Sequence, residues 1–546
     1  MPPVKQKNRG ANVLVRTLRD AGVRQVFTVS GNHIMSVFDA ALDGGIELIH
    51  ARHEAATVHM ADALSRISGE VGIALVTGGP GHANAVSALY TARMAEAPVV
   101  LLSGHAPSNQ LGMGAFQEMR QADMAAPVTK AAWTCSGADA VAGDIARAIR
   151  IAHSGRPGPV HVSLPSDALE GNANSTTVPT TAEFSPSRAL LDAHTADVLV
   201  GRLRHASRPM ILAGPACMTR RGRALTTALE AAAGIPVVGM ESPRGLADPS
   251  LGVFAELLAQ ADCVLLVGKR LDFTLRFGKQ PAFAPRCTFL QIDAEEEEFE
   301  RSRRALGERL AFTALADAFS AFNALTQQAS ASGPSHAAWR AEVRAAIKYR
   351  PAAWDHAASA VPERLHPVQA LRPLQALLDK HPDAALVSDG GEFGQWAQAC
   401  LAAPHRIING VAGSIGSALP YAIGARCALP DAPVVAVLGD GTFGFHPAEI
   451  DTAVRYNLPF VAVIGNDARW NAEYQIQLRE YGADRLVACD LRPTRYDLVS
   501  MAFGGYGDMV TDVANMAASV ERAHSSGVPA CLNVMIEGIA APQLKR

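Results

Sequence analysis

The sequence lacks the features of several protein classes. No apolar run among its 546 residues approaches the roughly 20 residues of a membrane-spanning helix. The first ten residues contain no apolar core or cleavage site, so we expect no secretory signal. A net charge of −3 leaves no basic excess for a nucleic-acid partner. These absences predict a cytoplasmic protein that binds neither a membrane nor nucleic acid.

Cysteine is scarce and scattered. The eight cysteines stand singly, with no C-x-x-C pair. Structural zinc sites and disulfide frameworks usually show such regular spacing. We therefore expect buried free thiols in a reducing compartment, with no disulfides and no zinc.

Short apolar runs, bounded by Gly, Pro or Asp, alternate with helix-like stretches along most of the chain. Hydrophobic residues make up 49% of the sequence, so large cores can form. Runs that are apolar throughout are typical of strands buried on both faces of a parallel sheet. The fold class predicted is therefore α/β, with several doubly wound parallel-sheet domains. The runs are Val26–Val29, Gly72–Thr77, Val99–Leu102, Val160–Ser163, Met210–Leu212, Val264–Val267, Pro433–Leu438 and Phe460–Ile464.

Two stretches without periodicity predict linkers. They are Asn172–Arg188, rich in Thr, Ser and Pro, and Thr326–Pro334, rich in Gln, Ala and Ser. A Pro-punctuated region follows the second of them. The predicted domains are residues 1–171, 189–325 and 360–546. The acidic run Glu295–Glu298 is interpreted as a solvated helix start, because carboxylates favour a helix N-terminus.

Polar side chains follow two successive predicted strands in the last third. Asp440, between Gly439 and Gly441, ends one strand, and Asn466 ends the next. Ligands bind at the carboxyl ends of parallel strands, and glycines allow close approach of an anion. A carboxylate, an amide oxygen and a backbone carbonyl suit Mg²⁺ together with phosphate oxygens. The alternative is a tight Gly-Asp-Gly turn that binds nothing.

Three further features are weaker individually. Glu54 opens a predicted helix in an apolar segment, where it could equally be a helix-start carboxylate. The run Gly78–Gly81 predicts a backbone loop at a strand end. The run Gly413–Gly416 precedes a predicted helix and could be a simple helix entry.

In their order and spacing, these motifs resemble the thiamine-diphosphate-dependent enzymes of the acetolactate synthase, benzaldehyde lyase and 2-hydroxyacyl-CoA lyase type. The resemblance covers nearly the full chain. It is carried by Arg52-His53-Glu54-Ala55-Ala56, Gly79-Pro80-Gly81, Ala115-Phe116-Gln117-Glu118, Pro127-Val128-Thr129-Lys130 and the segment from Gly439 to Asn466.

The resemblance implies a pyrimidine-binding, a central and a diphosphate-binding domain, of which the first and third share a fold. It also implies a cofactor held between the first domain of one subunit and the third domain of another. A homodimer would then be the minimal active unit, and a homotetramer is expected. The implied partners are the cofactor, Mg²⁺ and a small carbonyl substrate.

Individual residues match family positions. Glu54 matches the glutamate that hydrogen-bonds the pyrimidine ring, and Gln117 matches a polar group facing the thiazolium. His33 matches an active-site histidine of benzaldehyde lyase, although a structural role is the alternative. Matches to metal ligands are Asp440, Asn466 and the carbonyl of Ala468. Matches to cofactor-binding residues are Gly79, Gly413 (through its carbonyl), Ile415 (which bends the cofactor), Gly439, Gly441 and Thr442.

The implied activity makes or breaks a carbon–carbon bond next to a carbonyl, through an ylid and an enamine on the cofactor. We predict a lyase or carboligase acting on 2-hydroxy ketones or 2-hydroxyacyl thioesters. One alternative is an acetolactate-synthase-like decarboxylating transferase that uses a 2-keto acid. A second is a non-catalytic subunit that binds the cofactor or a nucleotide. Two positions depart from the family: Gly465 replaces an asparagine, and Ile415 replaces Met or Leu.

Other candidates stay open at this point. His53 is interpreted as structural, whereas His82 and His446 are undecided. The segment Leu271–Gly278 is similar to that of acyl-CoA-using relatives, so the central domain could hold ADP, CoA or FAD. Its candidate phosphate-binding cations are Lys269, Arg270 and Arg276, with solvated surface cations as the alternative.

Overall fold

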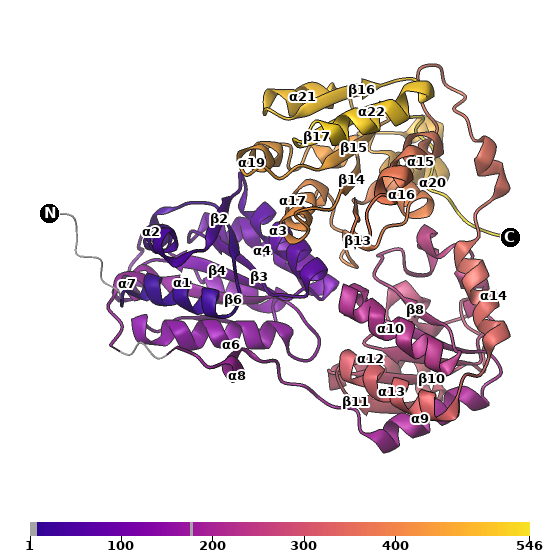
Figure 1. Cartoon of the computed structure of the whole chain (residues 1–546), viewed down its shortest axis with the longest axis horizontal. Coiled ribbons are helices and arrows are strands. Elements are labelled where there is room, and N and C mark those ends of the chain that lie inside the picture. Colours follow the sequence, from indigo (N-terminus) through magenta and orange to yellow (C-terminus); the bar gives the residue numbers. More distant parts are fainter. Residues whose placement is uncertain (1–7, 175–177) are drawn as a thin grey trace. The chain divides into compact units, whose positions relative to one another are not determined.

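The structure, a computed structural model, describes residues 8–174 and 178–546. Residues 1–7, where no secretory signal is predicted, and residues 175–177, in the first predicted linker, lie outside the described residues. The chain forms three parallel sheets covered by helices (Figure 1). It divides into two compact units, Met1–Ser187 with Ile423–Ala428 and Arg188–Ala422 with Leu429–Arg546.

The first sheet has six parallel strands in the order β2-β1-β3-β4-β6-β5. Every residue of β3 and β4 is buried, as expected for strands covered on both faces. The strands are β1 Gln25–Thr28, β2 Glu47–His50, β3 Gly72–Val76, β4 Val99–His105, β5 Ala132–Thr134 and β6 Val160–Pro165. The helices are α1 Gly10–Asp20, α2 Met35–Gly44, α3 Glu54–Ser68, α4 Pro80–Ala95, α5 Gln121–Ala125, α6 Val141–His153, α7 Ser166–Glu170 and α8 Thr181–Phe184.

The second sheet has five parallel strands in the order β11-β10-β9-β7-β8, with a separate apolar cluster on each face. Its strands are β7 Pro209–Ala213, β8 Val237–Gly239, β9 Cys263–Val267, β10 Thr288–Asp293 and β11 Leu310–Leu315. Its helices are α9 Ala193–His205, α10 Arg220–Ala233, α11 Phe254–Leu258, α12 Glu296–Leu306, α13 Ala318–Ser332 and α14 Ala337–Lys348.

The third sheet has six parallel strands in the order β13-β12-β14-β15-β17-β16. Its strands are β12 Ala385–Ser388, β13 His405–Ile408, β14 Val434–Gly439, β15 Val461–Asn466, β16 Tyr506–Val510 and β17 Ala530–Met535. Its helices are α15 Pro367–Leu378, α16 Gly391–Cys400, α17 Ala418–Ala428, α18 Asp440–Phe443, α19 Glu449–Arg455, α20 Asn471–Tyr481, α21 Tyr496–Ala502 and α22 Val513–Ser525.

The first and third sheets have the same strand order. In each, the first strand of the domain pairs with the second on one side and with the third on the other. The chain connections that follow β1 and β3 therefore run to opposite sides of the sheet, and so do those that follow β12 and β14. Ligands of open α/β sheets bind at such switch points, outside the carboxyl ends of the strands. This topology predicts one ligand site at the corresponding edge of each sheet.

Most sequence predictions of local structure are confirmed, one is wrong, and one is confirmed only in part. The predicted linker Thr326–Pro334 is helical as far as Ser332, because α13 continues through it. The acidic run begins α12 as predicted, but it is not wholly solvated, since Glu298 is only 2% exposed and accepts a hydrogen bond from Arg301. Each sheet falls within one predicted domain range, and the domain boundaries themselves stay a prediction.

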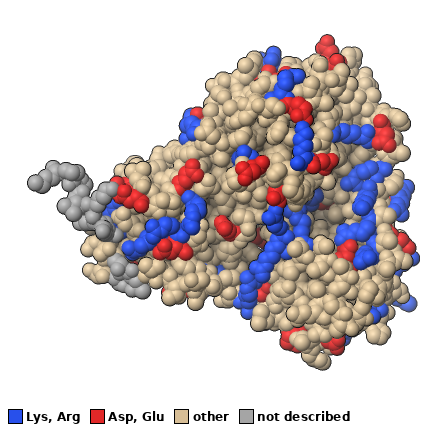
Figure 2. Space-filling view, in the orientation of Figure 1, with Lys and Arg blue, Asp and Glu red and all other residues tan. Residues whose placement is uncertain are grey.

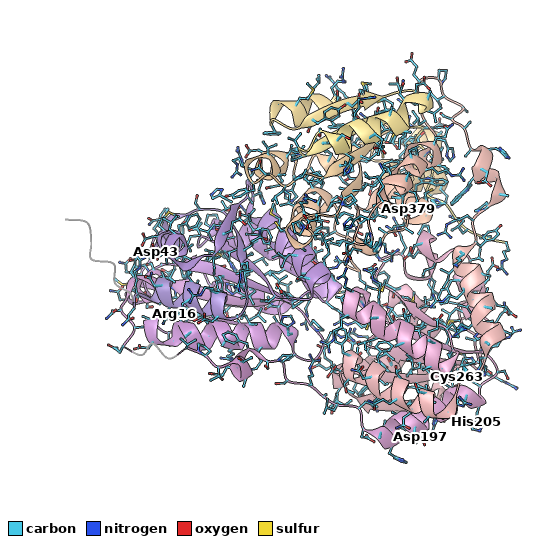
Figure 3. The ribbon with its side chains drawn as sticks, viewed as in Figure 1. Arg16, Asp43, Asp197, His205, Cys263 and Asp379 are labelled. Atoms are coloured by element: carbon cyan, nitrogen blue, oxygen red, sulfur yellow. The ribbon has the colours of Figure 1, made fainter. Side chains whose placement is uncertain are left out.

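The distribution of surface charge and the state of the cysteines can be compared with the composition. Figure 2 shows side chains of both charges on one face, with large areas that carry neither. All eight cysteines are free, and six of them are buried. Cys263, for example, lies in β9 of the central sheet (Figure 3). Among the described residues, no helix is long and apolar enough to cross a bilayer.

Candidate active site

The loops after β14 and β15 bring the predicted metal ligands together. The two strands pair in register, with Gly439 beside Gly465, so Asp440 and Asn466 leave neighbouring strand ends. Asp440 is 2% exposed, and its carboxylate accepts hydrogen bonds from the N–H of Gly441 (2.9 Å) and of Arg469 (3.2 Å). Ala468 has a φ of 60°, a left-handed conformation that turns the chain at this point.

Asn466 is fully buried and its amide is fixed. The Nδ2 group donates to the carbonyl of Thr494 and to Oδ1 of Asn533, both at 3.0 Å. Its Oδ1 atom is thereby turned towards the loop, where it accepts from the N–H of Ala468 at 3.3 Å. This network places an amide oxygen and a strained peptide at one strand end.

A second carboxylate, Asp467, lies beside Asp440 and was not singled out from the sequence. Burial raises the pKa of Asp440 to about 6. Burial, and then the charge of Asp440, raise the pKa of Asp467 to about 8. A bound divalent cation would offset this repulsion, so the donor set fits Mg²⁺. No group of three His, Cys, Asp or Glu ligands occurs in the described chain, so a cation would depend on this mixed set.

A cavity of about 290 Å³ adjoins the two loops. Glycine at position 390 lets Ile415 pack against the backbone there, because an added Cβ on Gly390 would lie 2.7 Å from Cγ2 of Ile415. Gly441 is constrained in the same way by the ring of Trp470, also at 2.7 Å. The predicted cofactor-binding residues that line the cavity are Gly413, Ile415, Gly439, Gly441 and Thr442.

Asp389, at the end of β12, fixes the loop that carries Gly413 and Ile415. Its fully buried carboxylate accepts hydrogen bonds from the N–H of Gly416 (3.0 Å) and of Ala418 (3.2 Å). Burial raises its pKa to about 6, although these N–H donors oppose the shift. Sequence reasoning missed this residue, because its partners lie 27 and 29 positions away.

We expect Asp389→Asn to bind the cofactor less tightly while becoming more stable at neutral pH. The pKa of Asp389 is raised from its ordinary value of 3.8 to about 6 in the folded protein. Its carboxyl group therefore stabilises the fold most below pH 3.8, and this stabilisation is lost as the pH rises through about 6. The variant should therefore gain up to about 3 kcal/mol over the wild type across that interval. Urea unfolding at several pH values, with calorimetry of thiamine diphosphate, measures both effects. Equal cofactor affinity would show that Asp389 does not position the loop.

Glu54 begins α3 in the first unit, as predicted. The side chain of His53 caps this helix by accepting the N–H of Ala55 at 3.1 Å, which agrees with its structural interpretation. Asn84 donates to Oε2 of Glu54 at 3.0 Å. An added Cβ on Gly81 would lie 3.3 Å from the other oxygen, Oε1. The carboxylate thus lies against the Gly-rich start of α4, half-buried and held by one amide.

His33 and Gln117 approach the same strand ends. His33 is 6% exposed, its Nδ1 lies 3.2 Å from Oγ1 of Thr77, and its ring stacks on Phe116. Burial lowers the pKa of His33, so its imidazole is neutral at neutral pH. Gln117 has a φ of 57°, and an added Cβ on Gly79 would lie 2.8 Å from its Cβ. The first unit therefore groups His33, Glu54, Gly79 and Gln117, and the second unit holds the other predicted residues.

Glu118 organises the loop that carries Phe116 and Gln117. Its carboxylate accepts hydrogen bonds from the N–H groups of Gly112, Gly114 and Ala115. The bond from Gly112, followed by that from Ala115, lowers the pKa of Glu118. The only sequence signal for this role was its place beside Gln117 in the Ala115–Glu118 motif.

Three buried histidines lie deeper in the same domain. His161 in β6 is fully buried, and neither of its ring nitrogens has a hydrogen-bond partner among the described residues. Its ring centroid is 4.5 Å from that of His82, which bonds Ser103. Burial lowers the pKa of His82 to about 4 and that of His161 well below its ordinary value of 6.5, and the charge of His105 adds to both shifts. His82 is therefore a buried neutral histidine.

We expect His161→Phe to make the first unit less sensitive to acid. Stability that depends on neutral buried histidines is present above pH 6.5 and falls as the pH drops towards 4. Each such histidine contributes a slope of up to about 1.4 kcal/mol per pH unit. Pulse proteolysis in urea, at neutral pH and at about pH 5, measures the change. The exposed His524→Phe serves as control, and equal acid sensitivity of all three proteins would contradict the prediction.

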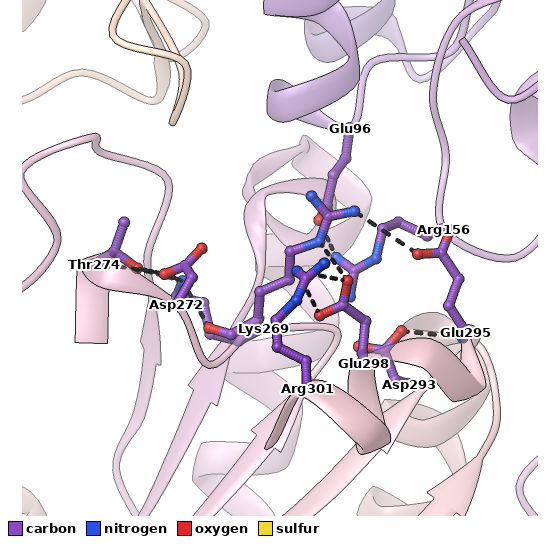
Figure 4. A network of polar contacts seen from close by, with 10 residues as sticks. Glu96, Arg156, Lys269, Asp272, Thr274, Asp293, Glu295, Glu298 and Arg301 are labelled. Carbon is purple, nitrogen blue, oxygen red and sulfur yellow. Dashed lines mark hydrogen bonds and ion pairs between the residues drawn. The ribbon is translucent and has the colours of Figure 1, made fainter. Parts of the chain in front are cut away.

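Two of the three candidate cations of the central domain are engaged inside the protein, and Figure 4 shows the polar contacts around one of them, Lys269. Lys269 is 2% exposed and donates to Oγ1 of Thr274 at 2.7 Å, with Asp272 at 3.6 Å. Arg270 pairs with Glu298 at 3.1 Å. Neither is a solvated surface cation, and only Arg276 of the three candidates is exposed.

Comparison with known proteins decides the family. Residues 8–124 match the thiamine pyrophosphate enzyme N-terminal TPP binding domain, residues 196–318 the central domain, and residues 389–534 the C-terminal TPP binding domain. The acetolactate synthase large subunit IlvG of Mycobacterium tuberculosis is 33% identical over 98% of both chains. The chain belongs to the thiamine pyrophosphate enzyme family.

Relatives within this family carry more than one name. The 2-hydroxyacyl-CoA lyase 2 of Homo sapiens is 29% identical over 97% of this chain and 90% of its own. The same protein of Caenorhabditis elegans is 28% identical over 93% of this chain and 85% of its own. The family expected from the motifs is thus confirmed, with its three-domain α/β fold and its thiamine diphosphate dependence.

Proposed function

We propose that this thiamine pyrophosphate enzyme is a carbon–carbon lyase or carboligase acting on 2-hydroxy ketones or 2-hydroxyacyl thioesters. The observation that carries the proposal is the pair of buried side chains Asp440 and Asn466, with the half-buried Ala468 two residues after Asn466, beside the 290 Å³ cavity. These residues would hold Mg²⁺ and, through it, the diphosphate of the cofactor. The thiazolium of the bound cofactor supplies a carbon nucleophile and an electron sink for cleavage next to a carbonyl.

Residues of this chain have distinct parts in this proposal. Glu54 would share a proton with the pyrimidine nitrogen, and Asn84 would keep its carboxylate in place. Asp389 would hold the Gly413–Ile415 loop against the pyrimidine. His33, neutral and held by Thr77, could hold or release a proton at the substrate oxygen.

A decarboxylating transferase that uses a 2-keto acid is the second candidate, supported by relatives named acetolactate synthase. A non-catalytic subunit is disfavoured, because Glu54, Asp440 and Asn466 are all retained. We also propose an assembly of at least two subunits, with a homotetramer and a cytoplasmic location as the expectation. A nucleotide in the central domain is less supported, since Lys269 and Arg270 are already engaged.

A substrate panel tests the proposal. The purified protein, with thiamine diphosphate and Mg²⁺, is incubated with benzoin, a 2-hydroxyacyl-CoA or pyruvate, and products are identified by mass spectrometry. Light scattering of the same samples measures the assembly. Cleavage of the first two substrates supports the lyase, whereas turnover of pyruvate alone supports the transferase. Failure to bind the cofactor would overturn both.

A further inference from the structure

The cavity beside Asp440 has a second set of polar side chains that the proposed mechanism does not use. They come from three places: Arg244 from the loop after β8, three side chains of α16, and Glu473 of α20. The α16 residues Glu392, Gln395 and Gln398 recur at three-residue spacing and therefore share one helix face. The cavity wall is thus more polar than a site for an alkyl or aryl group requires.

Arg244 lies on a turn whose backbone is held by hydrogen bonds. Its N–H donates to Oγ of Ser242 at 3.2 Å, which holds the backbone. The neighbouring Glu241 is 2% exposed and accepts from Nε of Arg406 in β13 at 2.9 Å, which ties the turn to the third sheet. Within residues 8–174 and 178–546, the exposed guanidinium makes no hydrogen bond or ion pair. A cation held in this way at a cavity is available to a ligand.

Gln398 gives an independent sign of a missing ligand. Its side chain is 3% exposed and lines the cavity. Its Oε1 atom is buried and accepts no hydrogen bond from any described residue. Buried acceptors are nearly always satisfied, so a hydroxyl or N–H group of a bound molecule is expected here, at a position distinct from that of an anionic group.

Among the described residues, no carboxylate of the cavity forms an ion pair with Arg244. Asp440 and Asp467 also line the cavity and belong to the proposed metal site. Glu473 is exposed to solvent.

Glu392 accepts from the N–H of Ala541 at 2.8 Å and from Gln395 at 3.3 Å, so it is engaged elsewhere. Burial raises the pKa of Glu392, which weakens its negative charge. The charge of Arg244 acts against this shift, so the guanidinium lies near Glu392, but among the described residues it forms no ion pair with it. Its hydrogen-bond donors therefore remain for a ligand.

We propose that Arg244 binds an oxyanion of the substrate in this cavity. The anion would be the carboxylate of a 2-keto acid or a phosphate of a coenzyme A thioester, because the planar guanidinium binds either group through two parallel hydrogen bonds. This inference rests on the proposed function, since it takes the cavity to be the one that receives the cofactor. It makes Arg244 a specificity residue and favours charged substrates over neutral ketones.

The test compares charged and neutral substrates in three variants of the full chain. Arg244→Gln should raise KM about tenfold to a hundredfold for the charged substrate, the usual effect of losing a bidentate ionic contact. The change for benzoin should be less than about threefold. Arg244→Lys should fall in between, because it keeps the charge but not the fork. Arg286→Gln, an exposed arginine of the same domain outside the cavity, is the matched control.

Calorimetry distinguishes the two sources of the anion without turnover. The probes are methyl acetylphosphonate, in place of a 2-keto acid, and adenosine 3′,5′-bisphosphate, in place of the phosphate end of coenzyme A. Loss of affinity for only one probe in Arg244→Gln identifies the source. Equal affinities of wild type and variant for both probes would overturn the inference. Cofactor binding with turnover in that case would leave the proposed function intact, whereas absent cofactor binding would overturn the function itself.

Discussion

Asp440→Ala should lose Mg²⁺-dependent retention of thiamine diphosphate. The substitution removes the one carboxylate of the predicted ligand set and leaves Asn466 and the Ala468 carbonyl without a charged partner. Because the diphosphate is bound through the cation, its own negative charge would then be uncompensated. We expect the affinity to fall by at least about a hundredfold, the upper range for loss of a supporting contact at a metal site.

Calorimetry with thiamine diphosphate, in the presence and absence of Mg²⁺, measures this loss directly. Asp379→Ala, an exposed carboxylate on the same domain, should behave as the wild type (Figure 3). Melting temperatures without Mg²⁺ show whether Asp440→Ala has folded. A folded variant with wild-type affinity would remove Asp440 from the metal site.

The fold was largely predictable because its strands carry a strong local signal. Strands such as β3 and β4 are buried along their whole length, and their continuous apolarity appears directly in the sequence. The error at Thr326–Pro334 has a local reason too. Gln, Ala and Ser in that segment favour a helix as readily as a linker, and packing of Leu325 and Ala329 on the central core decides the outcome.

The site was predictable where one short motif supplies several groups. Asp440 lies between two glycines, and Asn466 lies two residues before Ala468, so each short segment supplies more than one group. The pairing of β14 with β15 then brings the two segments together.

Residues that act through distant partners gave no such signal. Asp389 bonds a loop 27 residues further along, and Arg244 reaches the cavity from another domain. The buried state of Lys269 was also missed, although its partners Asp272 and Thr274 are only three and five positions away, because charge and spacing alone do not show that this turn is buried.

Glu54→Gln should bind the cofactor but slow proton exchange at the thiazolium carbon. The amide keeps the size of the side chain, and its oxygen can still accept the hydrogen bond that Asn84 donates to Glu54 at 3.0 Å. It cannot share a proton with the pyrimidine nitrogen. We therefore expect exchange to slow by about 10²–10⁴-fold, the usual contribution of a positioned acid or base. Cofactor affinity should stay within about tenfold, since the cation site belongs to other residues.

Hydrogen–deuterium exchange of the bound cofactor, followed by quenched-flow NMR, isolates this step from substrate binding. Glu70→Gln, an exposed carboxylate just beyond the far end of α3, controls for the loss of one charge. If Glu54→Gln exchanges the proton as fast as this control, Glu54 is only a helix-start carboxylate, and its interaction with the helix dipole explains its position. If exchange alone is slow and affinity is retained, a merely structural role is excluded, because a disturbed helix would weaken binding and exchange together.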